Sequence, residues 1–310
     1  MFCEKSEKTM AKLKTWIKAA RLRTLLLSFS GVLLGWFLAL KGEFYYPFPA
    51  LFAALTAMLL QILCNFANDY GDFKKGVDGA NRVGPQRELQ SGAITEKEML
   101  RALAVTVVAC LASGALLLLS TLLAHGDWTV ILVFAGLGIA AILAALFYTL
   151  GKRPYGYRGL GDLFCFLFFG WAAVAGTYAL AAPWLDFSVL LPASAMGFLS
   201  NAVLNINNMR DIENDRASGK NSLVVKIGLR KAFVYHCALI IGAFLCLSAY
   251  LVLKKTPFYT HAFWLLFPLF LKDLKAIKKT KPELLDPFLG QQVWHTFLLV
   301  LAFGLALWVA

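Results

Sequence analysis

Charged residues are scarce in this sequence: only 15% of its 310 residues are Asp, Glu, Lys or Arg. Ordinary soluble domains carry roughly 25%. Apolar residues are abundant instead: 59% of the chain is hydrophobic, and the mean hydropathy is +0.67. Apolar runs of about 20 residues, the length that crosses a hydrocarbon core, recur along almost the whole chain. The composition therefore excludes a soluble globular protein and predicts an integral membrane protein embedded in a lipid bilayer.

Cysteine and histidine, the side chains that hold most zinc sites, are also few. The chain has six cysteines and four histidines, and no C-x-x-C pair occurs. Five of the cysteines lie in or beside apolar runs, and the histidines are scattered singly. The sequence therefore indicates neither a disulfide framework nor a zinc or histidine-ligated metal site.

The apolar runs predict an all-α membrane protein with about nine transmembrane helices. Residues 1–23 precede the first run as a charged cytoplasmic segment, and residues 24–310 form one transmembrane domain with no room for a separate soluble unit. The eighth run is the shortest. The candidate spans are 24–40, 47–66, 100–123, 129–149, 161–182, 187–207, 232–253, 258–271 and 287–309.

Positive charge dominates what charge there is, with 30 Lys and Arg against 18 Asp and Glu. In a soluble chain this excess suggests a nucleic acid partner, but here its distribution follows the predicted topology. With the N-terminus in the cytoplasm, 27 of the 30 basic residues fall on the cytoplasmic face. This asymmetry obeys the positive-inside rule. We predict a cytoplasmic N-terminus, a C-terminus outside and no nucleic acid partner.

Half of the acidic residues lie in two segments, one after the second span and one after the sixth. In the first, Asn65, Asp69 and Asp72 are spaced by four and three residues, which places them on one helix face. In the second, Asp211 and Asp215 are four residues apart. Spans of equal parity run in the same direction, so both segments emerge on one face and are expected to meet there.

Two ladders of like charge beside a membrane need a cation to offset their repulsion. The oxygen ligands of Asp and Asn suit Mg²⁺, which is commonly held by a few carboxylates together with substrate phosphates. Lysines and arginines interleave with these acids, and such side chains bind phosphate oxygens well. The pattern predicts a metal-bridged diphosphate. The alternative is a pair of solvated loops whose acids balance nearby lysines.

Two stretches of small residues predict close helix packing rather than ligand contact. Gly31 and Gly35 form a G-x-x-x-G pair in the first span, and residues 135–145 of the fourth span are rich in Gly and Ala. Small residues let helix backbones approach closely in a membrane.

The two acidic segments resemble a known family. Residues 68–78 read N-D-Y-x-D-x-x-x-G-x-D and residues 207–220 read N-N-x-R-D-x-x-x-D-x-x-x-G-K, which is similar to the aspartate-rich motifs of the UbiA superfamily of intramembrane prenyltransferases. Three more stretches, 21–25, 90–94 and 148–162, resemble its 1,4-dihydroxy-2-naphthoate polyprenyltransferase branch, which serves menaquinone synthesis. The superfamily pattern has an aspartate where this chain has Gly76, and the acid follows at Asp78.

The resemblance implies nine helices around a central cavity, in the cell inner membrane, with the site facing the cytoplasm. It implies Mg²⁺-dependent transfer of a polyprenyl group from a polyprenyl diphosphate to 1,4-dihydroxy-2-naphthoate, with loss of CO₂ and diphosphate and formation of demethylmenaquinone. The metal ligands and catalytic carboxylates would be Asp69, Asp72, Asp211 and Asp215, with Asn65 and Asn208 as neutral donors and Asp78 as a further candidate.

Other residues are assigned to the substrates. The expected diphosphate ligands are Asn68, Lys75, Arg87, Arg210 and Lys220. The expected acceptor-binding residues are Arg23, Tyr148, Arg153, Tyr155 and Asp162. Each of this second group has a plainer alternative: interfacial anchoring for the arginines, an aromatic belt for the tyrosines, and an acid at a helix N-terminus for Asp162.

Two other functions remain open on sequence grounds. A related prenyltransferase acting on 4-hydroxybenzoate or homogentisate shares the diphosphate chemistry, and acceptor choice depends on fewer residues. A cation-coupled transporter also places acids within membrane helices, but transporter sites usually lie near the bilayer midplane. Here the acids lie at the cytoplasmic helix ends, which favours the enzyme.

Overall fold

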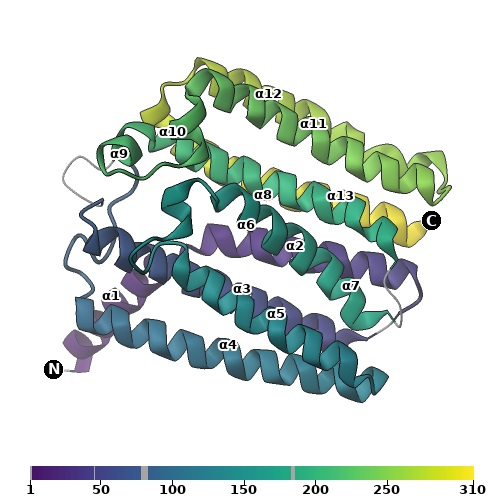
Figure 1. Ribbon diagram of the computed structural model, residues 1–310, viewed down its shortest axis with the longest axis horizontal. Coiled ribbons are helices and arrows are strands. Elements are labelled where there is room, and N and C mark those ends of the chain that lie inside the picture. Colours follow the sequence, from purple (N-terminus) through teal and green to yellow (C-terminus); the bar gives the residue numbers. More distant parts are fainter. Residues whose placement is uncertain (1, 45, 78–82, 183–185) are drawn as a thin grey trace.

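The computed structural model describes residues 2–44, 46–77, 83–182 and 186–310, and throughout these ranges its regular structure is helical (Figure 1). The predicted all-α class is therefore confirmed. The elements are α1 (Phe2–Ala20), α2 (Leu22–Lys41), α3 (Pro47–Lys74), α4 (Glu96–His125), α5 (Trp128–Phe147), η1 (Tyr155–Arg158), α6 (Gly161–Cys165), η2 (Phe166–Ala175, a π-helix), α7 (Gly176–Ala181), η3 (Phe187–Val189), α8 (Leu190–Arg210), α9 (Ile212–Ala217), α10 (Leu223–Ile227), α11 (Leu229–Leu253), η4 (Phe258–Leu266), α12 (Phe267–Lys279), η5 (Pro282–Leu284) and α13 (Asp286–Val309).

Eight helical stretches in the described part of the chain are long and apolar enough to cross a membrane. They coincide with eight of the nine predicted spans, and α6, η2 and α7 together make one of them. The remaining predicted span, 258–271, is divided between the 3-10 helix η4 and the first turns of α12. The number of crossings and the side of the membrane on which each end lies stay predictions.

The helix ends follow local sequence signals. Thr95 and Glu98 form a capping box at the start of α4, each side chain accepting a hydrogen bond from the other residue's backbone N–H. Gly126 ends α4 with a positive φ of 70°, a conformation that glycine adopts without a Cβ clash. Asp127 then caps α5 by accepting from the Thr129 amide at 2.8 Å. The α4–α5 hairpin is thus specified within a few residues.

Close helix packing at Gly31 and Gly35 is confirmed. A Cβ on Gly35 would lie 2.4 Å from the Val174 carbonyl oxygen, and one on Gly31 would lie 2.9 Å from the Ala173 Cβ. Real Cβ atoms do not approach so closely, so α2 and η2 meet at a separation that only glycine allows.

The small residues of α5 serve a different purpose from the one predicted. A Cβ added to Gly136 or Gly138 would have no atom within 4 Å, so this helix does not use its glycines for packing. Ala135, Gly138 and Ala141 instead line a large cavity. The expectation of close packing was therefore wrong for these two glycines, whereas Ala145 at the end of the stretch is buried in a packed cluster.

Figure 1 shows that the elongated helices run side by side between two ends of the molecule. The C-terminal end of α3 and the short helices α9 and α10 lie at the same end as the N-terminus, and the C-terminus lies at the other. Helix α8 has buried residues along its whole length. The packing places both acidic segments at one end of a single bundle.

Candidate active site

A cavity of about 1300 Å³ extends from the end of the bundle that carries the acidic segments into its interior. Asp69 and Asp72 lie on the last turns of α3, and Asp211 and Asp215 flank the start of α9. All four are buried and line the cavity. Asn214 donates a hydrogen bond to the Val77 carbonyl at 3.2 Å, which ties the segments together. The structure thus brings both acidic segments to one site, as their parity predicts.

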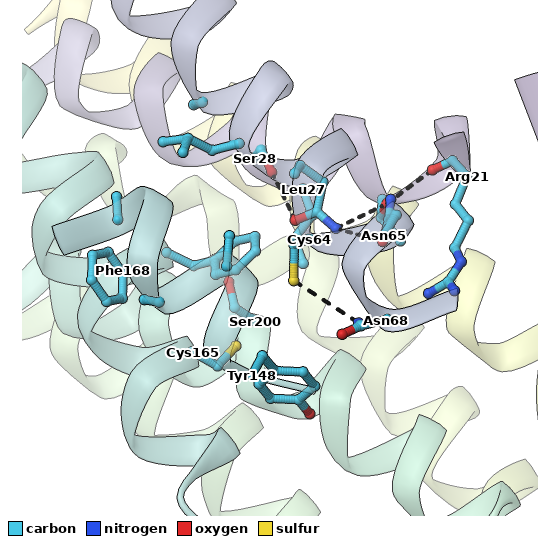
Figure 2. Close-up of a pocket in the computed structure, with 18 of the residues that line it drawn as sticks. Arg21, Leu27, Ser28, Cys64, Asn65, Asn68, Tyr148, Cys165, Phe168 and Ser200 are labelled. Atoms are coloured by element: carbon cyan, nitrogen blue, oxygen red, sulfur yellow. Dashed lines mark hydrogen bonds between the residues drawn. The ribbon is translucent and has the colours of Figure 1, made fainter. Parts of the chain in front are cut away.

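Asp69 is held between two arginines from different parts of the chain. The Arg21 guanidinium donates to its carboxylate, and Arg87 Nε lies 3.3 Å from the same oxygen, Oδ1. Arg21 stands at the break between α1 and α2 in a left-handed conformation, with φ 51° and ψ 64°. Such a conformation is unfavourable for a non-glycine residue, and it directs Arg21 into the cavity wall. Figure 2 shows Arg21 beside Asn65 and Asn68 of α3.

Asp72 is oriented by a tyrosine. The Tyr157 hydroxyl donates to Asp72 Oδ1 at 2.7 Å. The ring of the same tyrosine lies beneath Lys75, whose Nζ is 4.1 Å from the ring centroid, and within 5.8 Å of Lys220 Nζ. Tyr157 therefore connects a carboxylate of the site with two cations.

Arg210 is fully engaged by acidic and amide oxygens. Its Nε and Nη2 donate to the two carboxylate oxygens of Asp211 at 2.8 and 2.7 Å, and Nη2 also donates to Asn207 at 2.8 Å. Its Nη1 donates to Asp286 at the start of α13. Arg23 donates twice to Asp286, at 3.1 Å each. This chain of charges links α2, α8 and α13 around the cavity mouth.

Asp215 and Lys220 form a buried pair, with 3.4 Å between Nζ and Oδ1. Burial raises the pKa of Asp215 to about 6, although Lys220 opposes this shift. Burial by itself lowers the pKa of Lys220, but the surrounding carboxylates Asp215, Asp72 and Asp211 outweigh it and raise the pKa overall. Lys220 therefore stays charged among these carboxylates, in a position to bind an anion.

Two oxygens beside the acids fit a hard cation. Asn68 Oδ1 and Asp215 Oδ2 are buried and accept no hydrogen bond, which is costly unless another group binds them. Carboxylate and amide oxygens are the donors that Mg²⁺ prefers. Among the described residues, no three Asp, Glu, His or Cys side chains lie close enough to hold an ion by themselves. A Mg²⁺ ion here would take further ligands from a bound diphosphate.

The two asparagines expected as metal ligands have different surroundings. Asn65 lines the cavity, but its amide donates to the Ala20 carbonyl at 2.9 Å and to Thr24, and its oxygen accepts from Gln61 at 3.1 Å. It therefore fixes the break between α1 and α2. Asn208 is buried but does not line the cavity, whereas its neighbour Asn207 does. The two side chains differ because adjacent residues of a helix point about 100° apart.

Several residues expected to bind the substrates lie elsewhere. Lys75 donates to the Thr149 carbonyl at 2.9 Å and, with Arg153, lines a separate surface hollow. Asp162 accepts from Tyr235 at 3.1 Å and does not line the cavity. Arg23 reaches the cavity but is paired with Asp286. Arg87, Arg210, Lys220 and Asn68 line the cavity as expected, whereas Asp78 lies outside the described residues.

The two tyrosines expected at the acceptor site do line the cavity. The Tyr148 and Tyr155 rings are 5.3 Å apart in an edge-to-face arrangement, and Tyr155 stacks on Phe164 at 4.1 Å. The Tyr155 hydroxyl donates to the Ala144 carbonyl at 2.8 Å, which fixes its ring. In Figure 2, Tyr148 and Phe168 stand on the wall facing Cys64. The aromatic surface thus begins beside the acids and continues into the bundle.

Beyond the aromatic rings the cavity lining is mostly apolar, with a few hydroxyl side chains. Its walls come from α2, α3, α4, α5 and η2, and a packed cluster that includes Val32, Ala53, Leu117 and Leu180 borders it far from the acids. The cavity therefore combines a charged mouth with an apolar interior that suits a long hydrocarbon.

Some of the residues that build the site were not predicted from the sequence. They are Arg21, Tyr157, Asn207, Asn214 and Asp286. The first four lie within or beside the recognised motifs, so their spacing offered a signal. Asp286 offered none, because an acid at the start of a helix is common and its partners are remote in sequence.

Comparisons with known proteins identify the family of this chain. The sequence profile of the UbiA prenyltransferase family matches residues 28–298. The chain is 40% identical over 306 residues to the 1,4-dihydroxy-2-naphthoate octaprenyltransferase of Escherichia coli (strain K12), covering 98% of each chain. It is 42% identical over 301 residues to the protein of the same name from Haemophilus influenzae, covering 96% of each.

The fold is similar to that of a solved structure. A UbiA homolog from Archaeoglobus fulgidus, determined with GPP and Mg²⁺ bound, superposes with a TM-score of 0.61 at 15% identity, covering 96% of this chain and all of that one. At 15% sequence identity, this similarity supports the fold alone.

Proposed function

The chain belongs to the UbiA prenyltransferase family, and from that premise we propose that it transfers a polyprenyl group from a polyprenyl diphosphate to 1,4-dihydroxy-2-naphthoate, releasing CO₂ and diphosphate. Two enzymes named for this acceptor support the assignment, because the chain is 40–42% identical to them over nearly its full length. The observation that carries it is the convergence of two carboxylate pairs, with their arginine and lysine partners, at the mouth of a long apolar cavity.

The diphosphate belongs at the mouth of the cavity. Asp69, Asp72, Asp211 and Asp215 are the side chains that would hold Mg²⁺, and Asn68 Oδ1 is a neutral donor beside them. Bound there, Mg²⁺ would neutralise the negative charge that develops on the departing diphosphate. Lys220, Arg21 and Arg87 line the same region, so they can donate hydrogen bonds to phosphate oxygens once the carboxylates turn to the metal.

The prenyl chain belongs in the apolar interior. Its allylic carbon loses the C–O bond, and the positive charge on that carbon lies among the faces of Tyr148, Tyr155 and Phe164. Aromatic faces attract cations, and an apolar cavity excludes the water that would capture the cation. We propose that these rings also stack on the naphthoate.

The reaction balances without an oxidant. The naphthoate carbon that bears the carboxylate attacks the allylic carbon, and a C–C bond forms while the C–O bond to diphosphate breaks. The carboxylate then leaves as CO₂, and its bonding electron pair returns to the ring and restores aromaticity. The immediate product is therefore the diol form of the prenylated naphthoquinone, and demethylmenaquinone is its two-electron oxidised form.

The location follows from the same proposal. We propose a multi-pass protein of the cell inner membrane whose acidic mouth faces the cytoplasm. The exposed apolar residues on α4, α5 and α11 support a lipid environment, and the positive-inside charge supports the orientation.

Acceptor competition tests the function. Purified protein in lipid nanodiscs would receive Mg²⁺, a radiolabelled polyprenyl diphosphate and one aromatic acid at a time. We expect prenylated product and stoichiometric CO₂ with 1,4-dihydroxy-2-naphthoate, and little product with 4-hydroxybenzoate or homogentisate. Product from 4-hydroxybenzoate with none from the naphthoate would contradict the proposed acceptor while retaining the prenyl transfer.

A further inference from the structure

A second hollow, of about 580 Å³, lies on the surface beside the candidate active site. We call it the basic hollow. Its walls come from the end of α3, from the loop between α5 and α6 and from the turn after α9, so segments distant in sequence build it. Its lining includes Lys75, Lys152, Arg153, Tyr157, Arg158 and Ser218.

Four of these residues are cations, and none of the described residues that line the hollow is an acid. Two other basic side chains nearby do form ion pairs: Lys74 contacts Glu96 at 2.6 Å, and Arg216 contacts Glu213 at 3.0 Å. Within the described ranges, no ion pair involves the three cations of the 152–158 loop. Like charges that converge on one hollow repel each other, and an anion bound among them relieves that repulsion.

The hollow is held open by contacts to the backbone and to an aromatic ring. Lys75 donates to the Thr149 carbonyl at 2.9 Å while its Nζ lies 4.1 Å above the Tyr157 ring. Lys226 donates to the Arg158 carbonyl at 2.6 Å, which fixes the end of the 152–158 loop. The cations therefore surround a site whose backbone is already in place, which reduces the entropy cost of binding.

Tyr157 separates the basic hollow from the active-site cavity. Its hydroxyl donates to Asp72 of the cavity, and its ring faces Lys75 of the hollow. The two sites are thus neighbours, yet Lys75, Lys152, Arg153 and Arg158 do not line the cavity.

Apolar side chains lie beside the basic hollow at the adjoining ends of α5 and α6. Phe147 and Leu163 are each 52% exposed and Leu160 is 38% exposed. In a membrane protein, exposed side chains of this kind face acyl chains. The basic hollow therefore lies at the boundary between the apolar surface and the polar end of the molecule, at the level of lipid headgroups.

We propose that the basic hollow binds a phosphate-type anion outside the active-site cavity. Two sources of this chemistry reach it: the phosphodiester headgroup of an anionic lipid, and inorganic diphosphate, whose production rests on the proposed function. The arginines supply bidentate hydrogen bonds to phosphate oxygens, and the lysines supply point charges.

The lipid source is tested with the full-length protein in phosphatidylcholine nanodiscs that contain graded amounts of phosphatidylglycerol. Retained lipid is counted by native mass spectrometry. The hollow variant is Lys152→Gln/Arg153→Gln/Arg158→Gln. The matched control, Lys272→Gln/Lys275→Gln/Lys279→Gln, removes the same charge from exposed positions of α12. We expect the hollow variant to lose the tightly retained lipid and the control to keep it.

The second source is tested with labelled inorganic diphosphate in nanodiscs of phosphatidylcholine alone. A non-hydrolysable prenyl thiodiphosphate with Mg²⁺ first fills the cavity, so any remaining stoichiometric binding reports a separate site. If diphosphate is the ligand, the hollow variant loses this binding. A charge-retaining variant, Lys152→Arg/Arg153→Lys/Arg158→Lys, should keep whichever ligand the wild type binds, and it guards against loss through misfolding.

Neither measurement depends on enzyme turnover. A negative result would therefore overturn the proposed anion site without bearing on the proposed enzyme activity. Loss of lipid or of diphosphate confined to the hollow variant supports the proposal and identifies the source. Equal loss in the hollow and control variants would show that bulk surface charge is sufficient and would overturn it. Absence of both ligands from the wild type would overturn it as well.

Discussion

The guanidinium of Arg210 donates a hydrogen bond to the carboxylate of Asp286, although 76 positions separate the two residues. Arg210 also binds both carboxylate oxygens of Asp211, and its side chain is only 2% exposed. One buried cation is therefore shared between the second acidic motif and the first turn of α13. In the proposed metal site, Asp286 would restrain Arg210 and so set how strongly Arg210 competes with Mg²⁺ for Asp211.

Replacing Asp286 by alanine should weaken Mg²⁺ activation and lower kcat/KM by about 10²-fold, the scale expected when a positioning contact is lost. Without Asp286, the Arg210 charge falls entirely on Asp211 and opposes the metal there. Initial rates over a Mg²⁺ titration measure both effects. Glu283→Ala, an exposed acid three residues earlier, is the control and should behave like the wild type. An unchanged Mg²⁺ activation constant in Asp286→Ala would refute the coupling.

Tyr157→Phe should reduce turnover by about tenfold, because it removes the hydroxyl that donates to Asp72 and a hydrogen bond to a charged group contributes about 1.5–3 kcal/mol. The ring, and hence its contact with Lys75, is retained. Tyr155→Phe provides the comparison, since that hydroxyl donates to a backbone carbonyl outside the acidic motifs. We expect the Mg²⁺ activation constant to shift in Tyr157→Phe alone. Equal shifts in both variants would contradict a specific role of the Tyr157 hydroxyl at Asp72.

Metal binding should depend on pH through Asp215, whose pKa burial raises to about 6. The carboxylate is ionised above this value and protonated below it, and a proton competes with the metal. Affinity should therefore be level above about pH 7 and fall toward a limit of about tenfold per pH unit below about pH 5.

Electron paramagnetic resonance of Mn²⁺, with a non-hydrolysable prenyl diphosphate analogue bound, measures this affinity. Asp215→Asn cannot titrate, so it should bind weakly and lose the part of the pH dependence that belongs to this side chain. The analogue's own titration is common to both proteins. A wild-type profile identical in shape to that of Asp215→Asn would show that Asp215 does not set the pH dependence.

Two glycine substitutions should show which glycine lies in a tight helix interface and which lies beside the open cavity. Gly35→Ala should lower thermal stability, because its Cβ would lie 2.4 Å from the Val174 carbonyl oxygen and overpacking costs about 1–3 kcal/mol. Gly138→Ala should be tolerated, since nothing lies within 4 Å of its Cβ. Thermal unfolding in detergent compares them. Equal stability of the two variants would contradict the packing described for α2 and η2.

The sequence predicted the helices and the meeting of the acidic segments because both depend on local physical signals. Runs of apolar residues mark the spans, and helices of equal parity return to the same end. The i, i+4 spacing of Asp211 and Asp215 and the i, i+3 spacing of Asp69 and Asp72 were sufficient to place these carboxylates together. These features need no knowledge of which helices pack against each other.

The remaining features depend on packing between distant segments. Spacing did not distinguish Asn207 from Asn208, since the answer depends on which face of α8 meets the cavity. Lys75 lies within the first motif, yet Tyr157 separates it from the cavity. The role of Asp286 becomes visible only when α13 is placed beside α8. Glycines on α5 resembled a packing face because small residues suit both a tight interface and a wide cavity.

The joint role of the two acidic segments is measured by the Mg²⁺-dependent rate of prenyl transfer in four variants, each checked for folding in the membrane: Asp69→Ala, Asp72→Ala, Asp211→Ala and Asp215→Ala. We expect each of the four variants to lose activity by about 10²–10³-fold, and the wild type to become inactive after EDTA removes the metal. Lys74→Ala, an exposed residue paired with Glu96, should lose little. Normal Mg²⁺-dependent rates in any two of the aspartate variants would contradict the claim that both acidic segments hold one metal-bound diphosphate.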